Sequence, residues 1–115
     1  MRILHVDDEP VILELTQFYL ERTGDMKITS CRSAEEALGL LEIEKFDAII
    51  SDYEMPGMNG IDLLSRLRSA NITIPFVIFT GRGREEVVIE ALNKGADFYI
   101  QKGGEVRNWR LYISA

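Results

Sequence analysis

The sequence predicts an α/β fold in which a doubly wound, five-stranded parallel sheet carries helices on both faces. Short apolar runs alternate with longer amphipathic segments along the 115 residues, in the order βαβαβαβαβα. Strict alternation of this kind implies parallel strands joined by right-handed crossovers. The runs at 48–51 and 75–80 are almost continuously apolar, as expected for strands that helices cover on both sides.

The first strand is predicted at Arg2–Val6, and the first helix runs from Pro10 to about Arg22. Proline suits the first turn of a helix, because its missing N–H leaves no helical hydrogen bond unmade there. Gly24 can end the helix, since glycine readily adopts the left-handed conformation. The apolar residues at helical spacing are Ile12, Leu15, Phe18 and Tyr19.

The second strand is predicted at Lys27–Cys31 and the third at Ala48–Ser51. Between them, Ser33 and Glu36 have the spacing of a capping box, in which the serine caps the helix and the glutamate reaches back. A third helix begins at about Gly60. The apolar residues of these two helices are Ala37, Leu38, Leu41 and Ile43, and then Leu63, Leu64 and Leu67.

The last third of the chain repeats the pattern. Pro75–Thr80 reads as the fourth strand and Arg84–Lys94 as the fourth helix, which Gly95 ends. Phe98–Gln101 is predicted as the fifth strand. Glu105–Ile113 is predicted as a fifth helix, on the weakest apolar pattern of the five.

The composition is that of one soluble domain spanning residues 1–115. The formal net charge of −6 repels phosphate backbones, so we expect no direct nucleic-acid binding by this domain. No apolar run approaches the roughly 20 residues that a membrane span needs. The single cysteine, Cys31, excludes an internal disulfide and is typical of a small buried residue in a reducing compartment. We therefore expect a cytoplasmic location.

Polar residues stand directly after four of the five predicted strands. Because the carboxyl ends of parallel strands share one edge of the sheet, these residues should lie close together. Taken singly, each has a plain interpretation as a helix cap, a turn residue, a strand end or a solvated lysine. Three strand ends that supply three different chemical types favour a functional site instead. The residues at the ends of the first, third, fourth and fifth strands are, in that order, Asp7, Asp8 and Glu9, then Asp52, Thr80 and Lys102.

Three aspartates at one edge need compensation. At about 5 Å and an effective dielectric constant near 20, each pair of carboxylates repels by roughly 3 kcal/mol. Oxygen ligands of this kind suit a hard divalent cation, most simply Mg²⁺. Together with the Lys102 ammonium and the Thr80 hydroxyl, such a site could stabilise a transferring phosphoryl group. Asp52 could then act as the nucleophile and form an acyl phosphate.

Five motifs in this order resemble those of response-regulator receiver domains, the group that includes the chemotaxis protein CheY. The resemblance covers essentially the whole chain and implies a flavodoxin-like (βα)5 fold with strand order 2-1-3-4-5. The second motif is the most specific. The motifs are Val6-Asp7-Asp8-Glu9-Pro10, Ser51-Asp52-Tyr53-Glu54-Met55-Pro56-Gly57-Met58-Asn59-Gly60, Phe79-Thr80-Gly81, Gly95-Ala96-Asp97 and Tyr99-Ile100-Gln101-Lys102.

The resemblance implies a metal-dependent phosphoryl site. Asp52 would be the phospho-acceptor and would also contact the metal, which would be Mg²⁺ or Mn²⁺. Asp8 would bind the metal directly, Asp7 would bind it largely through water, and the backbone carbonyl of Glu54 would complete the protein ligands.

The resemblance also implies a switch. Lys102 would pair with the phosphoryl oxygens, Thr80 would move to hydrogen-bond them, and Tyr99 would swing inward behind Thr80. These movements would change the face formed by the helix at 84–94, the strand at 98–101 and the helix at 105–113.

The partners follow from the same resemblance. The donor would be a phosphohistidine on a sensor histidine kinase or a phosphotransfer protein, and the target a downstream output domain or protein. The receiver would carry out only its own phosphorylation and slow dephosphorylation, so it would not be an enzyme with a separate substrate. We expect a monomer or a weak homodimer through the switch face. The chain is either a stand-alone receiver or a piece of a larger regulator or hybrid kinase.

The sequence departs from the family pattern in two loops. Gly103-Gly104 replaces the proline that often follows the lysine, and Gly81–Arg84 replaces the small residue that usually follows the threonine. The resemblance places Glu54 and Arg82 beside the phosphoryl site, where they could pair and gate the attacking water or remain two independent solvated side chains. His5 is interpreted as a packed strand residue.

Two other functions remain open. The altered loops motivate a protein-interaction module that no longer uses phosphate. A Mg²⁺-dependent phosphohydrolase with an aspartate nucleophile is disfavoured, because the chain has Asp7-Asp8 in place of Asp-x-Asp and has no cap insertion.

Overall fold

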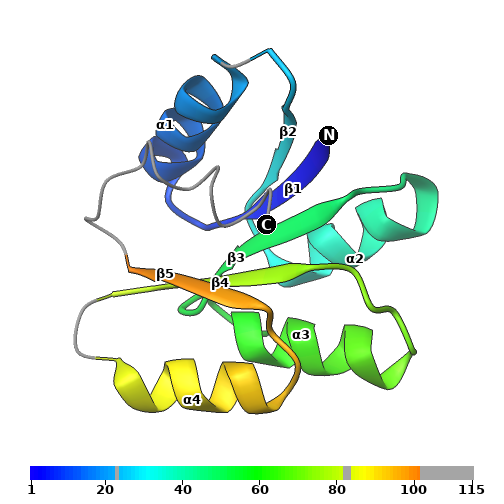
Figure 1. Cartoon of the computed structure of the whole chain (residues 1–115), viewed down its shortest axis with the longest axis vertical. Helices are drawn as coiled ribbons and strands as arrows, with labels where there is room; N and C mark the ends of the chain where they lie inside the picture. Colours follow the sequence, from blue (N-terminus) through cyan, green and yellow to red (C-terminus); the bar gives the residue numbers. More distant parts are fainter. Residues whose placement is uncertain (23, 82–83, 102–115) are drawn as a thin grey trace.

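A computed structural model describes residues 1–22, 24–81 and 84–101 of the chain. Five parallel strands form one sheet in the order β2-β1-β3-β4-β5, which confirms the predicted topology (Figure 1). The described residues hold four helices. The elements are β1 (Arg2–Val6), α1 (Pro10–Glu21), β2 (Lys27–Cys31), α2 (Ala34–Ile43), β3 (Ala48–Asp52), α3 (Gly60–Ser69), β4 (Phe76–Thr80), α4 (Glu85–Asn93) and β5 (Phe98–Gln101).

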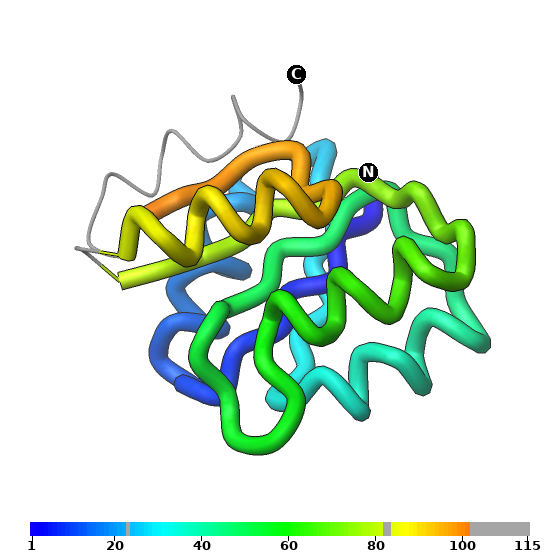
Figure 2. The backbone as a smooth tube through the Cα atoms, turned by 90° about the horizontal axis from the view of Figure 1, so that it is seen from below, coloured from blue at the N-terminus to red at the C-terminus, as the bar shows by residue number. Residues whose placement is uncertain are grey.

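The sheet separates two layers of helices. Successive residues of a strand point to opposite faces, so β1 sends Ile3 to one side and Leu4 and Val6 to the other. α1 covers the first side, and α2, α3 and α4 cover the second; the view from below in Figure 2 brings these three helices to the front. Each side buries its own apolar cluster, so the sheet is covered twice, as its apolar strands predict.

The helix boundaries follow local signals in the sequence. Glycine ends α1 and α4 as predicted, with positive φ angles of +82° at Gly24 and +104° at Gly95. The Ser33 hydroxyl accepts a hydrogen bond from the Glu36 N–H at 3.1 Å, which confirms the cap of α2. The reciprocal half of that capping box was wrong, because the Glu36 carboxylate accepts from the Arg32 N–H at 3.4 Å instead. A complete capping box begins α3, and the sequence reasoning missed it.

That second capping box joins Asn59 and Asp62. The Asn59 side chain accepts from the Asp62 N–H at 2.8 Å, and the Asp62 carboxylate accepts from the Asn59 N–H at 3.0 Å. It fixes the point at which the loop after β3 becomes a helix.

Three of the four apolar residues that indicated α1 (Leu15, Phe18 and Tyr19) are exposed, and the fourth, Ile12, is partly buried against the core. The buried residues are Leu13, Thr16 and Leu20, whereas Phe18 is 60% exposed. Thr16 lies in the middle of the buried stripe, so a count of apolar residues selects the neighbouring stripe. The Arg22 guanidinium lies 5.5 Å from the centre of the Phe18 ring and covers part of it.

Several expectations lie outside the described residues: the fifth helix at 105–113, Lys102, Arg82 and Gly103-Gly104. The strand predicted at 48–51 is one residue longer and includes Asp52. Within the described part of the chain, no helix is long and apolar enough to cross a membrane.

Candidate functional site

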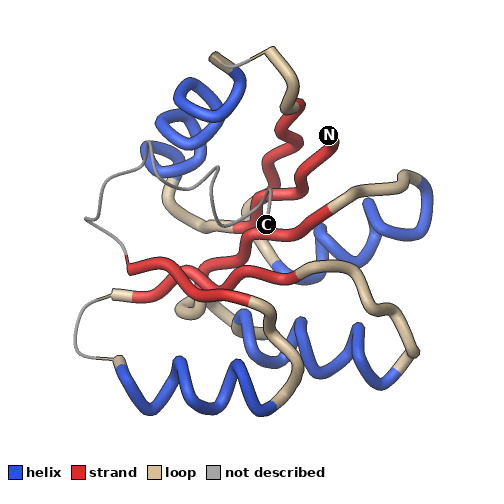
Figure 3. The backbone as a smooth tube through the Cα atoms, in the orientation of Figure 1, coloured by secondary structure: helices blue, strands red, loops and turns tan. Residues whose placement is uncertain are grey.

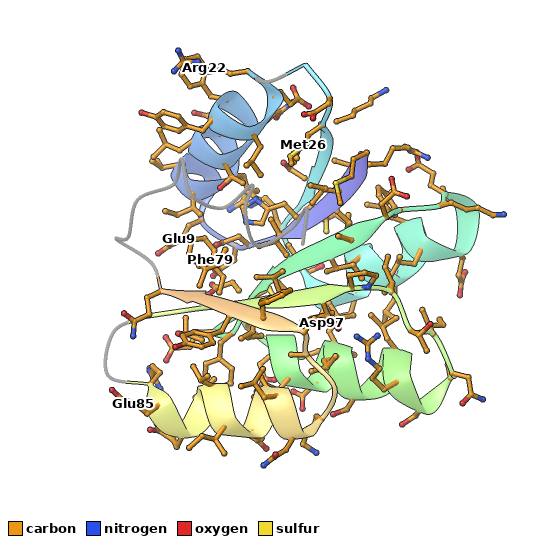
Figure 4. The ribbon with its side chains drawn as sticks, viewed as in Figure 1. Glu9, Arg22, Met26, Phe79, Glu85 and Asp97 are labelled. Carbon is orange, nitrogen blue, oxygen red and sulfur yellow. The ribbon has the colours of Figure 1, made fainter. Side chains whose placement is uncertain are left out.

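The loops that follow β1, β3 and β4 open at one edge of the sheet (Figure 3). They surround a hollow of about 640 Å³. Glu9 and Phe79 lie at this edge in Figure 4, and Asp97 lies at the opposite one. The residues lining the hollow are Asp8, Glu9, Asp52, Tyr53, Glu54, Met55, Pro56, Gly57, Asn59, Gly81 and Arg84.

Three of the predicted carboxylates come together at this edge. One oxygen from each of Asp7, Asp8 and Asp52 lies within 4.8 Å of the other two. Asp7 is fully buried and Asp52 is 3% exposed, while Asp8 is partly exposed. Buried carboxylates this close repel strongly unless a cation joins them. The donor set is all oxygen, and it fits a hard divalent cation such as Mg²⁺.

The backbone on both sides holds the acids in place. The Asp7 N–H donates to the carbonyl of Cys31 at 3.1 Å, and one Asp7 carboxylate oxygen accepts from the Glu9 N–H at 2.9 Å. Asp52 is the last residue of β3 and lies opposite Phe79 of β4. The next N–H, from Tyr53, donates to the Phe79 carbonyl at 2.9 Å. The aspartates therefore project from the ends of fixed strands.

Gly60 brings the start of α3 against the backbone of Asp52. A Cβ atom at this position would lie 2.3 Å from the Asp52 carbonyl oxygen and 2.8 Å from Ile78 Cδ1. The Gly60 N–H also donates to the Tyr53 carbonyl at 3.0 Å. Only glycine allows this approach, so Gly60 fixes the Asp52 backbone from the helix side. From the sequence, Gly60 marked only the start of a helix.

The other predicted site residues that the structure describes lie outside the cluster of three aspartates. Thr80 is 1% exposed, and its hydroxyl has no hydrogen-bond partner among the described residues. Tyr99 lies on β5 with 44% of its surface exposed. Glu54 lines the hollow. Lys102 follows the last described residue of β5, so its position is not described.

Arg84 is a residue of the site that the sequence reasoning missed. Its guanidinium forms an ion pair with the Glu54 carboxylate and lies 5.8 Å from the centre of the Tyr53 ring. The sequence left open whether Glu54 pairs with Arg82 or stays an independent solvated side chain, and Arg82 lies outside the described residues. The available signal was an arginine at the very start of the predicted fourth helix, close in the fold to the loop that carries Glu54.

Cys31 and His5 are buried, as the sequence predicts for both. Burial raises the pKa of the Cys31 thiol to about 12, so it stays protonated and is a poor nucleophile. His5 is fully buried, with its ring 6.3 Å from that of Phe79.

The chain matches known proteins along nearly its whole length. The model of the response regulator receiver domain matches residues 3–113. Response regulator SaeR of Staphylococcus aureus (strain USA300) is 37% identical over 112 residues, which cover 97% of this chain and 48% of that protein. The chain thus spans about half the length of the curated relatives it matches.

Two solved structures that resemble this chain are also receiver domains. The receiver domain of Francisella response regulator 1452 superposes with a TM-score of 0.91 at 30% identity, covering 98% of this chain and 93% of that one. The signal receiver domain of a signal transduction histidine kinase from Syntrophus aciditrophicus gives 0.88 at 31% identity, covering 98% and 86%. With the acidic cluster at the predicted sheet edge, these matches show that the chain belongs to the response regulator receiver family of two-component signalling.

Proposed function

We propose that this domain is a phosphorylation-dependent switch that accepts a phosphoryl group on Asp52 in a Mg²⁺-dependent reaction. The observation that carries the proposal is the position of Asp52. It ends a buried strand, lines an open hollow, and lies within 4.8 Å of the carboxylates of Asp7 and Asp8. A lone nucleophile beside a cation site is the arrangement that phosphoryl transfer needs.

Asp7, Asp8 and Asp52 would hold the cation, with the backbone carbonyl of Glu54 as a further ligand. Mg²⁺, or Mn²⁺ in its place, would neutralise the carboxylates and the charge on the phosphoryl oxygens. Because the three acids repel one another without a cation, binding should be coupled to the stability of the folded site.

In the transfer, a carboxylate oxygen of Asp52 forms a bond to phosphorus while the bond from phosphorus to the donor histidine nitrogen breaks. The electron pair of that bond stays on the imidazole, which takes up a proton from solvent. Lys102 would offset charge on the phosphoryl oxygens. Water later hydrolyses the acyl phosphate slowly. The domain would therefore act only on its own phosphoryl group and turn over no separate substrate.

The switch itself would begin at Thr80. A buried hydroxyl without a hydrogen-bond partner among the described residues is unfavourable, and a phosphoryl group on Asp52 would supply an acceptor. Movement of Thr80 leaves room for the half-exposed Tyr99 to turn inward. The phosphoryl group shifts the equilibrium only as far as the two conformations differ in affinity for it. The readout would be the face of α4 and β5 together with residues 105–113.

The partners would be a sensor histidine kinase or phosphotransfer protein and an output domain or protein, acting in the cytoplasm. We propose that residues 1–115 form one receiver domain, alone or within a larger regulator or hybrid kinase, and that it is monomeric or weakly dimeric through the switch face. Its net charge of −6 argues against direct contact with nucleic acid.

Incubation with acetyl phosphate and Mg²⁺, followed by intact mass measurement, tests the proposal. We expect an adduct of about 80 Da, the mass of one phosphoryl group. EDTA should abolish it, and so should Asp52→Asn. No adduct on the wild-type chain, or an adduct that persists in Asp52→Asn, would show that Asp52 is not the acceptor.

A further inference from the structure

We infer that Arg84 is a positioning residue of the phosphoryl site, and that its ion pair with Glu54 is exchanged for an ion pair with the incoming phosphoryl group. The inference rests on the proposed function and adds a residue and a mechanism to it. It starts from the ion pair between the entry of α4 and the loop after β3.

Arg84 links two walls of the hollow. It is the residue before α4, and it lines the hollow together with Asp52 and Glu54. Its guanidinium reaches the Glu54 carboxylate in the loop after β3 and lies 5.8 Å from the centre of the Tyr53 ring. The aromatic ring restricts where the guanidinium can move, so it keeps the charge near the opening.

The charges around the hollow are unequal. Four of the described residues that line it are acidic: Asp8, Glu9, Asp52 and Glu54. Among the described residues that line it, Arg84 is the one cation. The Arg32 guanidinium donates to the backbone oxygen of Asp8 at 3.3 Å, outside this lining. An anionic phosphoryl donor that enters the hollow therefore meets Arg84 as its main attraction from the described side chains.

Arg84 can leave the Glu54 carboxylate and pair with a phosphoryl group instead. The side chains of Arg84 and Glu54 are 40% and 65% exposed, and ion pairs this exposed are weak. A phosphoryl group carries about two negative charges and binds a guanidinium in a bidentate manner, so it competes well with a single carboxylate. The exchange moves Arg84 toward Asp52 and leaves the Glu54 carboxylate at the opening.

The exchange would also reach α4. The Arg84 carbonyl accepts hydrogen bonds from the N–H groups of Val87 and Val88, each at 3.1 Å. The backbone of Arg84 is therefore tied to the first turn of the helix. A change in the direction of its side chain acts on the start of the helix that belongs to the proposed switch face.

The two single variants separate this role from a structural one. If the ion pair only supported the fold, loss of either side chain would have the same effect. If Arg84 positions the phosphoryl group, Arg84→Ala removes the attraction and leaves Glu54 to repel the donor. Glu54→Gln does the opposite, because it releases Arg84 for the donor. The two variants should therefore change phosphorylation in opposite directions.

The experiment follows the mass adduct over time at several acetyl phosphate concentrations with saturating Mg²⁺. We expect Arg84→Ala to slow phosphorylation about fivefold, the scale of one exposed ion pair, and to raise the donor concentration that gives half the maximal rate. Arg84→Lys should recover part of the loss, and Glu54→Gln should phosphorylate faster than wild type. Arg22→Ala is the matched control, since Arg22 lies at the far end of α1 from Glu9 (Figure 4).

The outcomes distinguish the inference from the function on which it rests. No adduct on the wild-type chain overturns both. A wild-type adduct with Arg84→Ala equal to Arg22→Ala overturns the inference alone, as does a change in the same direction in Arg84→Ala and Glu54→Gln. If thermal melting shows that Arg84→Ala is unfolded, Glu54→Gln decides, because a rate no faster than wild type rejects the exchange.

Discussion

Replacement of Asp52 by asparagine should stabilise the metal-free protein. The carboxylate oxygens of Asp7, Asp8 and Asp52 lie within 4.8 Å of one another. At an effective dielectric constant near 20, each like-charged pair at this distance costs about 3 kcal/mol. The substitution removes two of the three pairs and keeps the shape of the side chain.

The sum of the two pair repulsions is an upper limit for the gain in stability, because the three acids differ in exposure to water. Asp7 and Asp52 are almost fully buried, so water screens their repulsion little. Asp8 is partly exposed, which weakens its repulsion of Asp52. We expect the free energy of unfolding to rise by about 2–4 kcal/mol in Asp52→Asn.

Urea unfolding in EDTA measures the effect of the repulsion, and urea unfolding in millimolar Mg²⁺ measures the stabilisation by the cation. In EDTA, Asp52→Asn should unfold at higher urea than wild type with an unchanged slope. Mg²⁺ should stabilise wild type more than the variant, because a cation that binds only the folded cluster contributes in proportion to its affinity. Glu14→Gln removes one charge from an exposed position on α1 and is the control. Equal stability of Asp52→Asn and Glu14→Gln in EDTA would refute the repulsion argument.

Three further predictions concern the scaffold. Gly60→Ala should lower the free energy of unfolding by about 2–3 kcal/mol and slow phosphorylation, since its Cβ would lie 2.3 Å from the Asp52 carbonyl; normal urea stability would contradict this. Arg68→Ala should cost about 3 kcal/mol, because its guanidinium donates to three backbone carbonyls, whereas exposed Arg66→Ala should cost almost nothing. Cys31, whose pKa is raised to about 12 from 9.0, should resist thiol reagents until the protein unfolds. Its protonated folded form should also make the stability of wild type fall faster than that of Cys31→Ala as the pH rises from 9.0 toward 12.

The sheet and its acidic edge could be predicted because they depend on strand order and on the residue that ends each strand. Asp7, Asp8 and Asp52 needed no knowledge of side-chain packing, since parallel strands end at a shared edge. The buried face of α1 could not be predicted in this way. Its central residue is Thr16, so the apolar pattern pointed to exposed residues such as Phe18.

Two features of the site depend on tertiary distances that no local pattern contains. The need for glycine at position 60 comes from the Asp52 carbonyl, which lies across the loop. The partner of Glu54 depends on where α4 begins. Because that helix starts at Glu85 and not one residue earlier, Arg84 stays in the loop with its side chain on the hollow.

The energetics of the site favour the switch over an interaction module that no longer uses phosphate. Two costs fall at the same sheet edge: three carboxylates within 4.8 Å, and a buried Thr80 hydroxyl with no hydrogen-bond partner among the described residues. A module that needed only its fold would have no use for three carboxylates that repel one another. A cation and a phosphoryl group would remove both costs at once. Costs that fall together at one sheet edge are the expected mark of a site selected for ligand binding.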